Sequence, residues 1–258
     1  MTQATGAAFA GSVACLTEPA LTGLSDQLAR VPGLGPAERA VILESTRATL
    51  CDALLRKVNR VLVLELNIAR VTGKLTADDP AARWSQFLRM SEGLPFWESL
   101  SGQYPTMLDQ LRAVIAGRCA AAAAVGQRLG ADRPQLVGLL GGEPGELTGI
   151  AMGAGDSHRG GQTVSVLELT GGSVVYKPRS VHVDEVLSEF LAVVLGDVGD
   201  TSRIRVPRVV ARRSTGGRSM WLTGIALGRR SCLSSTAASV TGWESCGCLA
   251  AVTCMRRT

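Results

Sequence analysis

Residues 162–177 read QTVSVLELTGGSVVYK. Apolar and polar side chains alternate over residues 164–169, as they do in a strand that is buried on one face. Gly171-Gly172 is a two-residue turn of the kind that joins antiparallel strands, and a second apolar run follows it and ends at Lys177. The segment therefore predicts a β-hairpin.

Helical spacing dominates the chain before this hairpin. Apolar residues recur every three, four or seven positions after Pro36, which predicts one helix of roughly 35 residues that stops at Thr72-Gly73. Further helices are predicted to open at Asp79-Pro80, to cover residues 94–100, to run from Tyr104-Pro105 to Gly130, and to run from an Asp132 cap to residue 140.

The order of elements predicts an α+β fold in which helices and strands are segregated. A helix over residues 183–195 and a strand over 206–211 follow the hairpin. We expect four parts, which are a flexible lead-in over residues 1–35, a helical region over 36–141, a small lobe of hairpin, helix and strand over 142–212, and an irregular, disordered tail over 213–258.

Composition excludes several classes of protein. With 46% hydrophobic and 19% charged residues, the 258-residue chain is neither generally disordered nor a coiled coil. It has no apolar run long enough for a membrane span, and its first basic residue is Arg30, so we expect no export signal. Seven irregularly spaced cysteines then predict reduced thiols and a cytoplasmic location.

The net charge of +5 is unevenly distributed. Residues 203–258 contain ten arginines, no lysine and a single acidic residue, Glu244, whereas the preceding residues are net acidic. A basic chain would ordinarily suggest nucleic-acid binding. Because the excess lies at one end, without the aromatic or glycine module of an RNA-binding segment, we expect no nucleic-acid partner.

Residues 153–161 read GAGDSHRGG and lie between two predicted strands. Four glycines in nine residues allow the backbone to approach a ligand closely, and Asp156, His158 and Arg159 would line the bend. The segment fails the dinucleotide fingerprint, because His158 stands where the third glycine belongs and a strand follows. The alternative is an ordinary glycine-rich turn with solvated Asp and His side chains.

Lys177 ends an apolar strand that follows this glycine segment. Protein kinases place a strand lysine behind a glycine loop so that its ammonium reaches the phosphates of ATP, and a glutamate on the next helix holds that lysine. The helix predicted over residues 183–195 carries Glu185 and Glu189, of which Glu189 is the preferred partner. The alternative for Lys177 is a surface lysine at the end of a strand.

Two motifs resemble a known family. Gly155-Asp156-Ser157-His158-Arg159-Gly160-Gly161 and Tyr176-Lys177-Pro178-Arg179 resemble the G-D-x-H-x-x-G and Y-K-P-R segments in the dehydratase domain of class II lanthipeptide synthetases. Weaker resemblances lie upstream, at Leu64-Glu65-Leu66-Asn67, at Arg83-Trp84 and Phe87, and at Tyr104-Pro105. The resemblance covers roughly residues 40–212.

The resemblance implies a partial lipid-kinase-like small lobe and a two-step reaction. ATP phosphorylates Ser and Thr of a leader-bearing precursor peptide, and the same domain then eliminates phosphate to leave dehydroalanine or dehydrobutyrine. Lys177 and Arg179 would contact ATP phosphates beside the backbone of Gly160 and Gly161. Asp156 and His158 would lie in the same pocket and assist proton transfer in either step. The family uses Mg²⁺ with ATP, and uses zinc only in a separate cyclase domain.

Residues that this chemistry needs downstream are missing from the sequence. No Asp follows Asp200 and no His follows His182, so the family's catalytic loop and magnesium-binding acids are absent. We therefore expect an inactive fragment of a synthetase. The alternative is a non-catalytic peptide-binding module or relic, and the sequence leaves the oligomeric state open.

The composition of the tail suggests coding DNA that is read out of frame, with a junction near residues 216–218. Four of the seven cysteines lie in this tail, but they lack the paired spacing of a zinc site, which disfavours a metal centre. The other reading frames of the gene test the idea, because a frameshift requires a synthetase-like continuation in one of them.

Overall fold

The computed structural model describes residues 8–158, 162–178, 208–214 and 217–223, together with Val186, Phe190 and Val193. Its helices are α2 (Ala10–Ala29), α3 (Pro36–Val71), α4 (Pro80–Ser91), α5 (Leu94–Ser99) and α6 (Met107–Leu140). Its strands are β1 (Leu147–His158), β2 (Gln162–Leu169), β3 (Gly172–Lys177), β4 (Arg208–Ser214) and β5 (Gly217–Thr223).

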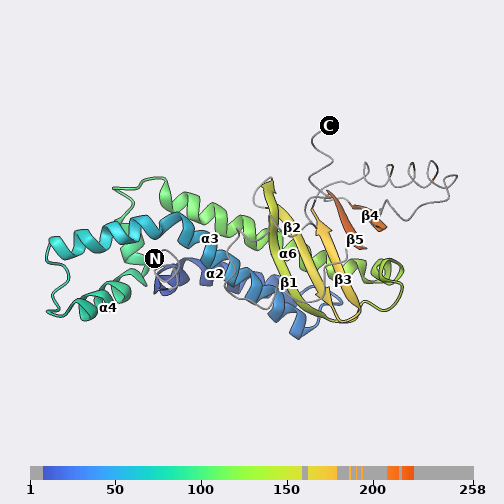
Figure 1. Cartoon of the computed structure of the whole chain (residues 1–258), viewed down its shortest axis with the longest axis horizontal. Helices are drawn as coiled ribbons and strands as arrows, with labels where there is room; N and C mark the ends of the chain where they lie inside the picture. Colours follow the sequence, from blue (N-terminus) through green and yellow to red (C-terminus); the bar gives the residue numbers. More distant parts are fainter. Residues whose placement is uncertain are drawn as a thin grey trace.

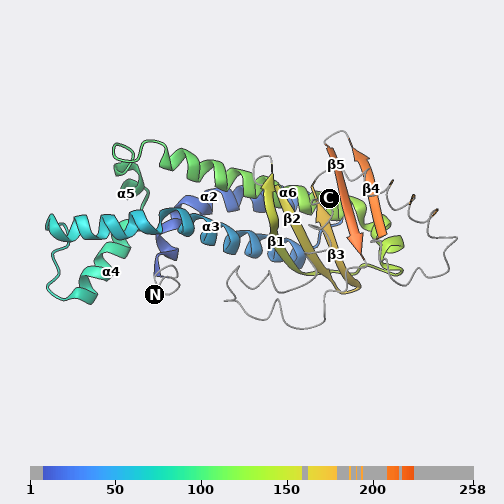
Figure 2. The same cartoon turned by 45° about the horizontal axis from the view of Figure 1, so that its top comes forward.

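Two long helices form the frame of the molecule. α3 and α6 run side by side, and the sheet packs across one end of this pair while α4 and α5 lie at the other end (Figures 1 and 2). α2 packs against both long helices, α3 contacts β1, and α6 contacts β2, β4 and β5. The helical part thus precedes the sheet in the chain and supports one of its faces, which confirms the predicted α+β class.

The predicted limits of α3 and α4 are confirmed. Pro36 stands in the first turn of α3, where a missing N–H costs nothing, and the helix ends at Val71, before Thr72. Asp79 caps α4, because its carboxylate accepts a hydrogen bond of 2.9 Å from the backbone N–H of Ala82. The short helix expected over residues 94–100 is α5.

Residues 10–29 are not a flexible lead-in, and that expectation was wrong. They form the 20-residue helix α2, whose buried side chains belong to the main core. The ring centroids of Phe9 and Trp84 lie 5.1 Å apart. The indole N–H of Trp97 donates a 2.9 Å hydrogen bond to the carbonyl of Ser12. The glycines, serines and threonines of this segment and Pro19 have low helix propensity, so the helix depends on packing more than on local preference.

α6 continues through the point where the sequence predicted a break. Gly130 permits close packing instead of ending the helix, because a Cβ there would lie 2.4 Å from the carbonyl oxygen of Pro32. Asp132 does not cap a new helix; it is buried and accepts a 3.0 Å hydrogen bond from the indole N–H of Trp221. Pro134 is accommodated within the last turns of the same helix.

The five described strands form one antiparallel sheet in the order β1-β2-β3-β5-β4. The predicted hairpin is β2–β3, in which Leu169 pairs with Gly172. One row of paired residues crosses four strands, namely Met152, Ser165, Tyr176 and Trp221. Tyr176 and Trp221 are buried, with ring centroids 5.1 Å apart, so this row lies on the face that packs against the helices.

The boundary predicted at residue 213 is too early. β4 extends to Ser214, and β5, over residues 217–223, inserts between β3 and β4. The sequence of this segment did not predict a strand, because β5 is defined by its pairing with β3 and β4. The rest of the predicted tail lies outside the described residues. The same holds for the helix predicted over 183–195, apart from Val186, Phe190 and Val193, which are helical.

Replacing Trp221 by Phe is expected to lower the free energy of unfolding by about 1–3 kcal/mol, because buried Asp132 loses a hydrogen-bond donor while the ring remains. Urea titration followed by circular dichroism measures the change. A Trp221→Phe chain as stable as the wild type would contradict the placement of β5 against α6.

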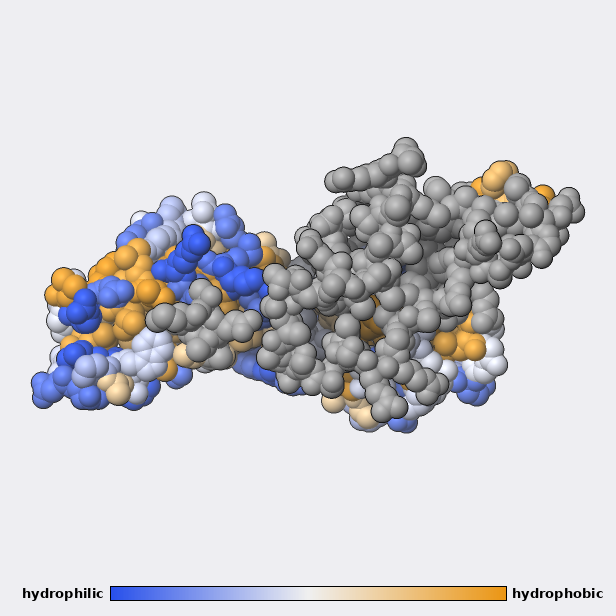
Figure 3. Space-filling model, viewed as in Figure 1, coloured by the Kyte–Doolittle hydropathy of each residue, from blue (hydrophilic) through white to orange (hydrophobic). Residues whose placement is uncertain are grey.

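Apolar surface gathers at the helical end of the molecule (Figure 3). The exposed apolar side chains there belong to α3, α4 and α5, and they are Val63, Leu64, Val71, Met90 and Leu94. Among the described residues, no helix has both the length and the apolar character needed to cross a membrane.

Candidate functional site

Lys177 occupies the last position of β3 and is buried, with only 6% of its surface exposed. The side chain is engaged within the protein and is not free. A lysine removed from water to this degree needs compensating polar or charged groups, because an isolated buried ammonium is very unfavourable. The alternative of an ordinary surface lysine at a strand end is therefore wrong.

The two faces of β3 have different environments. Side chains alternate along a strand, so Lys177 projects from the face opposite to that of Tyr176. Tyr176 faces α6 and the helical core, whereas Lys177 pairs with Met220 of β5 on the next row of the sheet. The lysine therefore belongs to the sheet face opposite the one that α3 and α6 cover.

The glycine segment is more regular than its sequence suggested. β1 continues through Gly155, Asp156 and Ser157 to His158, which pairs with Gln162, so only residues 159–161 remain for the connection to β2. Register shifts interrupt the pairing after Met152 and after Ala154, and Gly153 has a φ of +90°, which favours glycine. The expected open bend over residues 153–161 is thus an irregular strand end followed by a short connection.

Topology brings this strand end and Lys177 to the same end of the sheet. β1 and β3 both pair antiparallel with β2, so they run in the same direction and finish at the same edge. Ser165 pairs with both Met152 and Tyr176, which places Ala154 and Lys177 one step beyond that row, on either side of β2. The backbone of Asp156 and His158 continues from Ala154 toward this edge.

Several expected site residues lie beyond what the structure describes. For Asp156 and His158 the backbone is placed and the side chains are outside the description. Gly160, Gly161, Arg179 and both candidate glutamates, Glu185 and Glu189, lie outside the described residues altogether. Their roles therefore stay predictions.

The described residues contain no set of side chains that could form a metal centre. No three His, Cys, Asp or Glu side chains gather there in a way that would hold a metal ion. The magnesium implied by the resemblance thus finds no place among these residues.

A buried carboxylate ties the base of the sheet to both long helices. Glu38 of α3 accepts 2.8 Å hydrogen bonds from the backbone N–H groups of Leu147 and Gly35 and forms an ion pair with Arg133 of α6. Burial alone would raise the pKa of Glu38, but these donors outweigh it and the pKa is lowered. This cluster fixes the start of β1, and sequence analysis had no signal for it because its members are distant in the chain.

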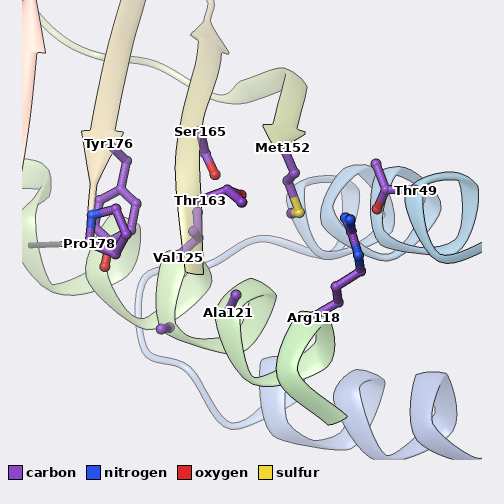
Figure 4. A pocket seen from close by; sticks show the side chains of 10 residues that line it. Thr49, Arg118, Ala121, Val125, Met152, Thr163, Ser165, Tyr176 and Pro178 are labelled. Carbon is purple, nitrogen blue, oxygen red and sulfur yellow. The ribbon is translucent and has the colours of Figure 1, made fainter. Parts of the chain in front are cut away.

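A cavity lies on the opposite side of the sheet from the Lys177 face (Figure 4). It is enclosed by α3, α6 and the helix-facing side of β1, β2 and β3, with Met152, Ser165 and Tyr176 among its walls. Its volume of about 20 Å³ leaves room only for a small group, which is far too little for a nucleotide. Lys177 is not part of its lining.

One comparison with known proteins covers this half of the chain. Residues 104–225 match a domain of unknown function, DUF4135. The match spans α6 and all five described strands, so the glycine segment and Lys177 lie within it, whereas α2 to α5 precede it. The DUF4135 match also includes β5, which lies beyond the boundary predicted at residue 213. No curated protein matches the chain.

Proposed function

We propose that the sheet end formed by the β1–β2 connection and Lys177 binds the phosphates of ATP. The observation that carries this proposal is a buried lysine at the last position of β3, at the same edge as the glycine-rich end of β1. An ammonium on a flexible stem suits contact with phosphate oxygens, and glycines let backbone N–H groups approach them. Arg179 and the backbone of Gly160 and Gly161 are proposed to complete the phosphate contacts.

The resemblance extends this proposal to a reaction. The chain is then the N-terminal part of a lanthipeptide dehydratase domain that phosphorylates Ser and Thr of a leader-bearing precursor peptide and eliminates phosphate. Asp156 and His158 are proposed to move protons in one or both steps. A cytoplasmic location belongs to the same proposal, and the free thiols of Cys15, Cys51 and Cys119 support it.

These 258 residues alone are expected to bind ATP without transferring its phosphate. Phosphoryl transfer needs acidic groups that hold magnesium and orient the acceptor, and the sequence has no Asp after Asp200. Mass spectrometry of a Ser/Thr-rich precursor peptide, incubated with the chain, ATP and Mg²⁺, is expected to find neither phosphate nor loss of water.

An active dehydratase assayed with the same peptide shows that the substrate is competent. Phosphopeptide or dehydrated peptide above the background of a Lys177→Met chain would contradict the expected inactivity.

A second candidate function is peptide binding without chemistry. The exposed apolar side chains at the helical end, on α3, α4 and α5, favour it, because such surface is typical of peptide-binding sites. A titration with leader peptide separates the two functions. Binding that a Leu64→Glu change weakens and a Lys177→Met change leaves intact would favour the peptide-binding module.

A further inference from the structure

The cavity between the sheet and the two long helices contains an unusual arginine. Arg118 of α6 is partly buried, and within the described ranges it has no hydrogen-bond or ion-pair partner. Figure 4 shows its guanidinium group rising from α6 to end beside Met152 and Thr49. A desolvated guanidinium that lacks an acceptor is unfavourable unless an anion occupies the space before it.

The charges around Arg118 do not neutralise it. Burial lowers the pKa of Arg118, and the positive charge of Arg56 lowers it further, while Asp52 opposes the shift. Asp52 is itself paired with Arg56, so its charge is already balanced. Arg118 together with Asp52 and Arg56 of α3 therefore carries a net positive charge.

Hydroxyl groups face this arginine from the sheet. Ser165 is 97% buried and Thr163 lies two residues before it on β2; neither hydroxyl has a hydrogen-bond partner in the described part of the chain. Both side chains project from β2 into the cavity that Arg118 also lines, and Met152 lies between them and the guanidinium in this view (Figure 4). From α3, the Thr49 hydroxyl donates to the carbonyl of Thr46 at 3.1 Å. Hydroxyl donors and a guanidinium that converge on one small space are the groups that hold oxyanions.

We propose that this cavity binds a small oxyanion, which is held by Arg118 and by the hydroxyls of Thr163 and Ser165. The cavity volume of about 20 Å³ leaves room only for a small group, so the ligand is a small free ion or the charged end of a longer molecule. The apolar remainder of the lining, with Ala121 and Val125 of α6, strengthens the attraction by excluding water. This site is separate from the proposed ATP site, because Lys177 lies on the other face of the sheet.

Thermal unfolding of the whole chain in sodium phosphate or sodium acetate, with ionic strength held constant by sodium chloride, tests the site. At least one anion is expected to raise the unfolding temperature in a saturable way beyond the effect of chloride. A response to phosphate alone assigns a phosphate group, a response to acetate alone assigns a carboxylate, and a response to both assigns the shared oxyanion chemistry.

Three variants locate the effect. Arg118→Gln is expected to weaken binding of the anion at least tenfold, and Ser165→Ala is expected to weaken it about threefold or more. Arg112→Gln is the matched control, since Arg112 lies on the same helix, is exposed and pairs only with Asp109 in the described residues. Lys177→Met separates the two sites, because an anion effect that this change removes and Arg118→Gln leaves intact would assign the anion to the proposed ATP site instead.

Two outcomes would overturn the proposal. One is a wild-type chain that neither anion stabilises beyond chloride, and the other is an Arg118→Gln chain that responds like the wild type. Far-UV circular dichroism confirms that each variant is folded before its response is scored.

Discussion

Glu38→Ala is expected to lower the free energy of unfolding by about 3–5 kcal/mol, because removal of one partner from a buried ion pair leaves the other uncompensated. Glu38 is 3% exposed and accepts hydrogen bonds from Leu147, Gly35 and Arg133. The guanidinium of Arg133 also donates to the carbonyls of Gly33 and Gly145, so the loss spreads to three segments. Urea denaturation of the purified chain measures the change.

The control is Glu44→Ala on the same helix. Glu44 is 78% exposed and its ion pair with Arg47 is 3.7 Å long, so its removal is expected to change the free energy of unfolding by less than about 0.5 kcal/mol. Equal stability losses in the two variants would contradict the role of Glu38 in joining α3, α6 and β1.

Low pH is expected to remove the contribution of Glu38 to the free energy of unfolding. The pKa of Glu38 is lower in the folded chain than in the unfolded chain, so its stabilisation is fully present above the unfolded pKa and is lost as pH falls through the folded pKa. Unfolding of wild type and Glu38→Gln at pH 7 and at pH 3 tests the sign. The difference between the two chains is expected to shrink at pH 3, and a constant difference would contradict it.

Lys177→Met is expected to weaken ATP binding at least tenfold, because it removes the ammonium and keeps the length of the stem. The anisotropy of a fluorescent ATP analogue measures the affinity. Lys57→Met is the matched control, since Lys57 is an exposed lysine on α3, far from the sheet edge in the sequence. A Lys177→Met chain that binds the analogue as tightly as the wild type would contradict the proposed site.

Elements with strong local signals were predictable from the sequence. α3 has a long apolar stripe, Pro36 in its first turn and a stop at Thr72-Gly73, and the structure follows all three. The β2–β3 hairpin has alternating side chains and a glycine turn, which the structure places at Thr170-Gly171, one residue before the predicted Gly171-Gly172. In both cases local conformational preference and the final packing agree, which makes the pattern sufficient.

Elements defined by distant partners were not predictable. α2 consists largely of small residues and acquires its stability from contacts of Phe9 and its buried leucines with α3, α4 and α6. β5 opens with Gly217, Arg218 and Ser219, and becomes a strand by pairing with β3 and β4. The sequence around Asp132 is typical of a helix cap, yet its buried carboxylate accepts a hydrogen bond from the indole N–H of Trp221.

The candidate site was predictable only in part. The motif around Lys177 indicated a lysine at the end of a strand near a glycine segment, and the sheet places the two at one edge. Arg118 and Ser165 had no signal, because a cavity formed by a helix and a strand that lie far apart in the chain leaves no pattern in the sequence.

Hydrogen–deuterium exchange with and without ATP tests the proposed nucleotide site, because it reports where along the backbone the nucleotide binds. We expect slower exchange in peptides that cover residues 153–178, no change in α4 and α5, and loss of this protection in the Lys177→Met chain. Unchanged exchange in residues 153–178 at saturating ATP, in a chain whose helices remain protected, would contradict it.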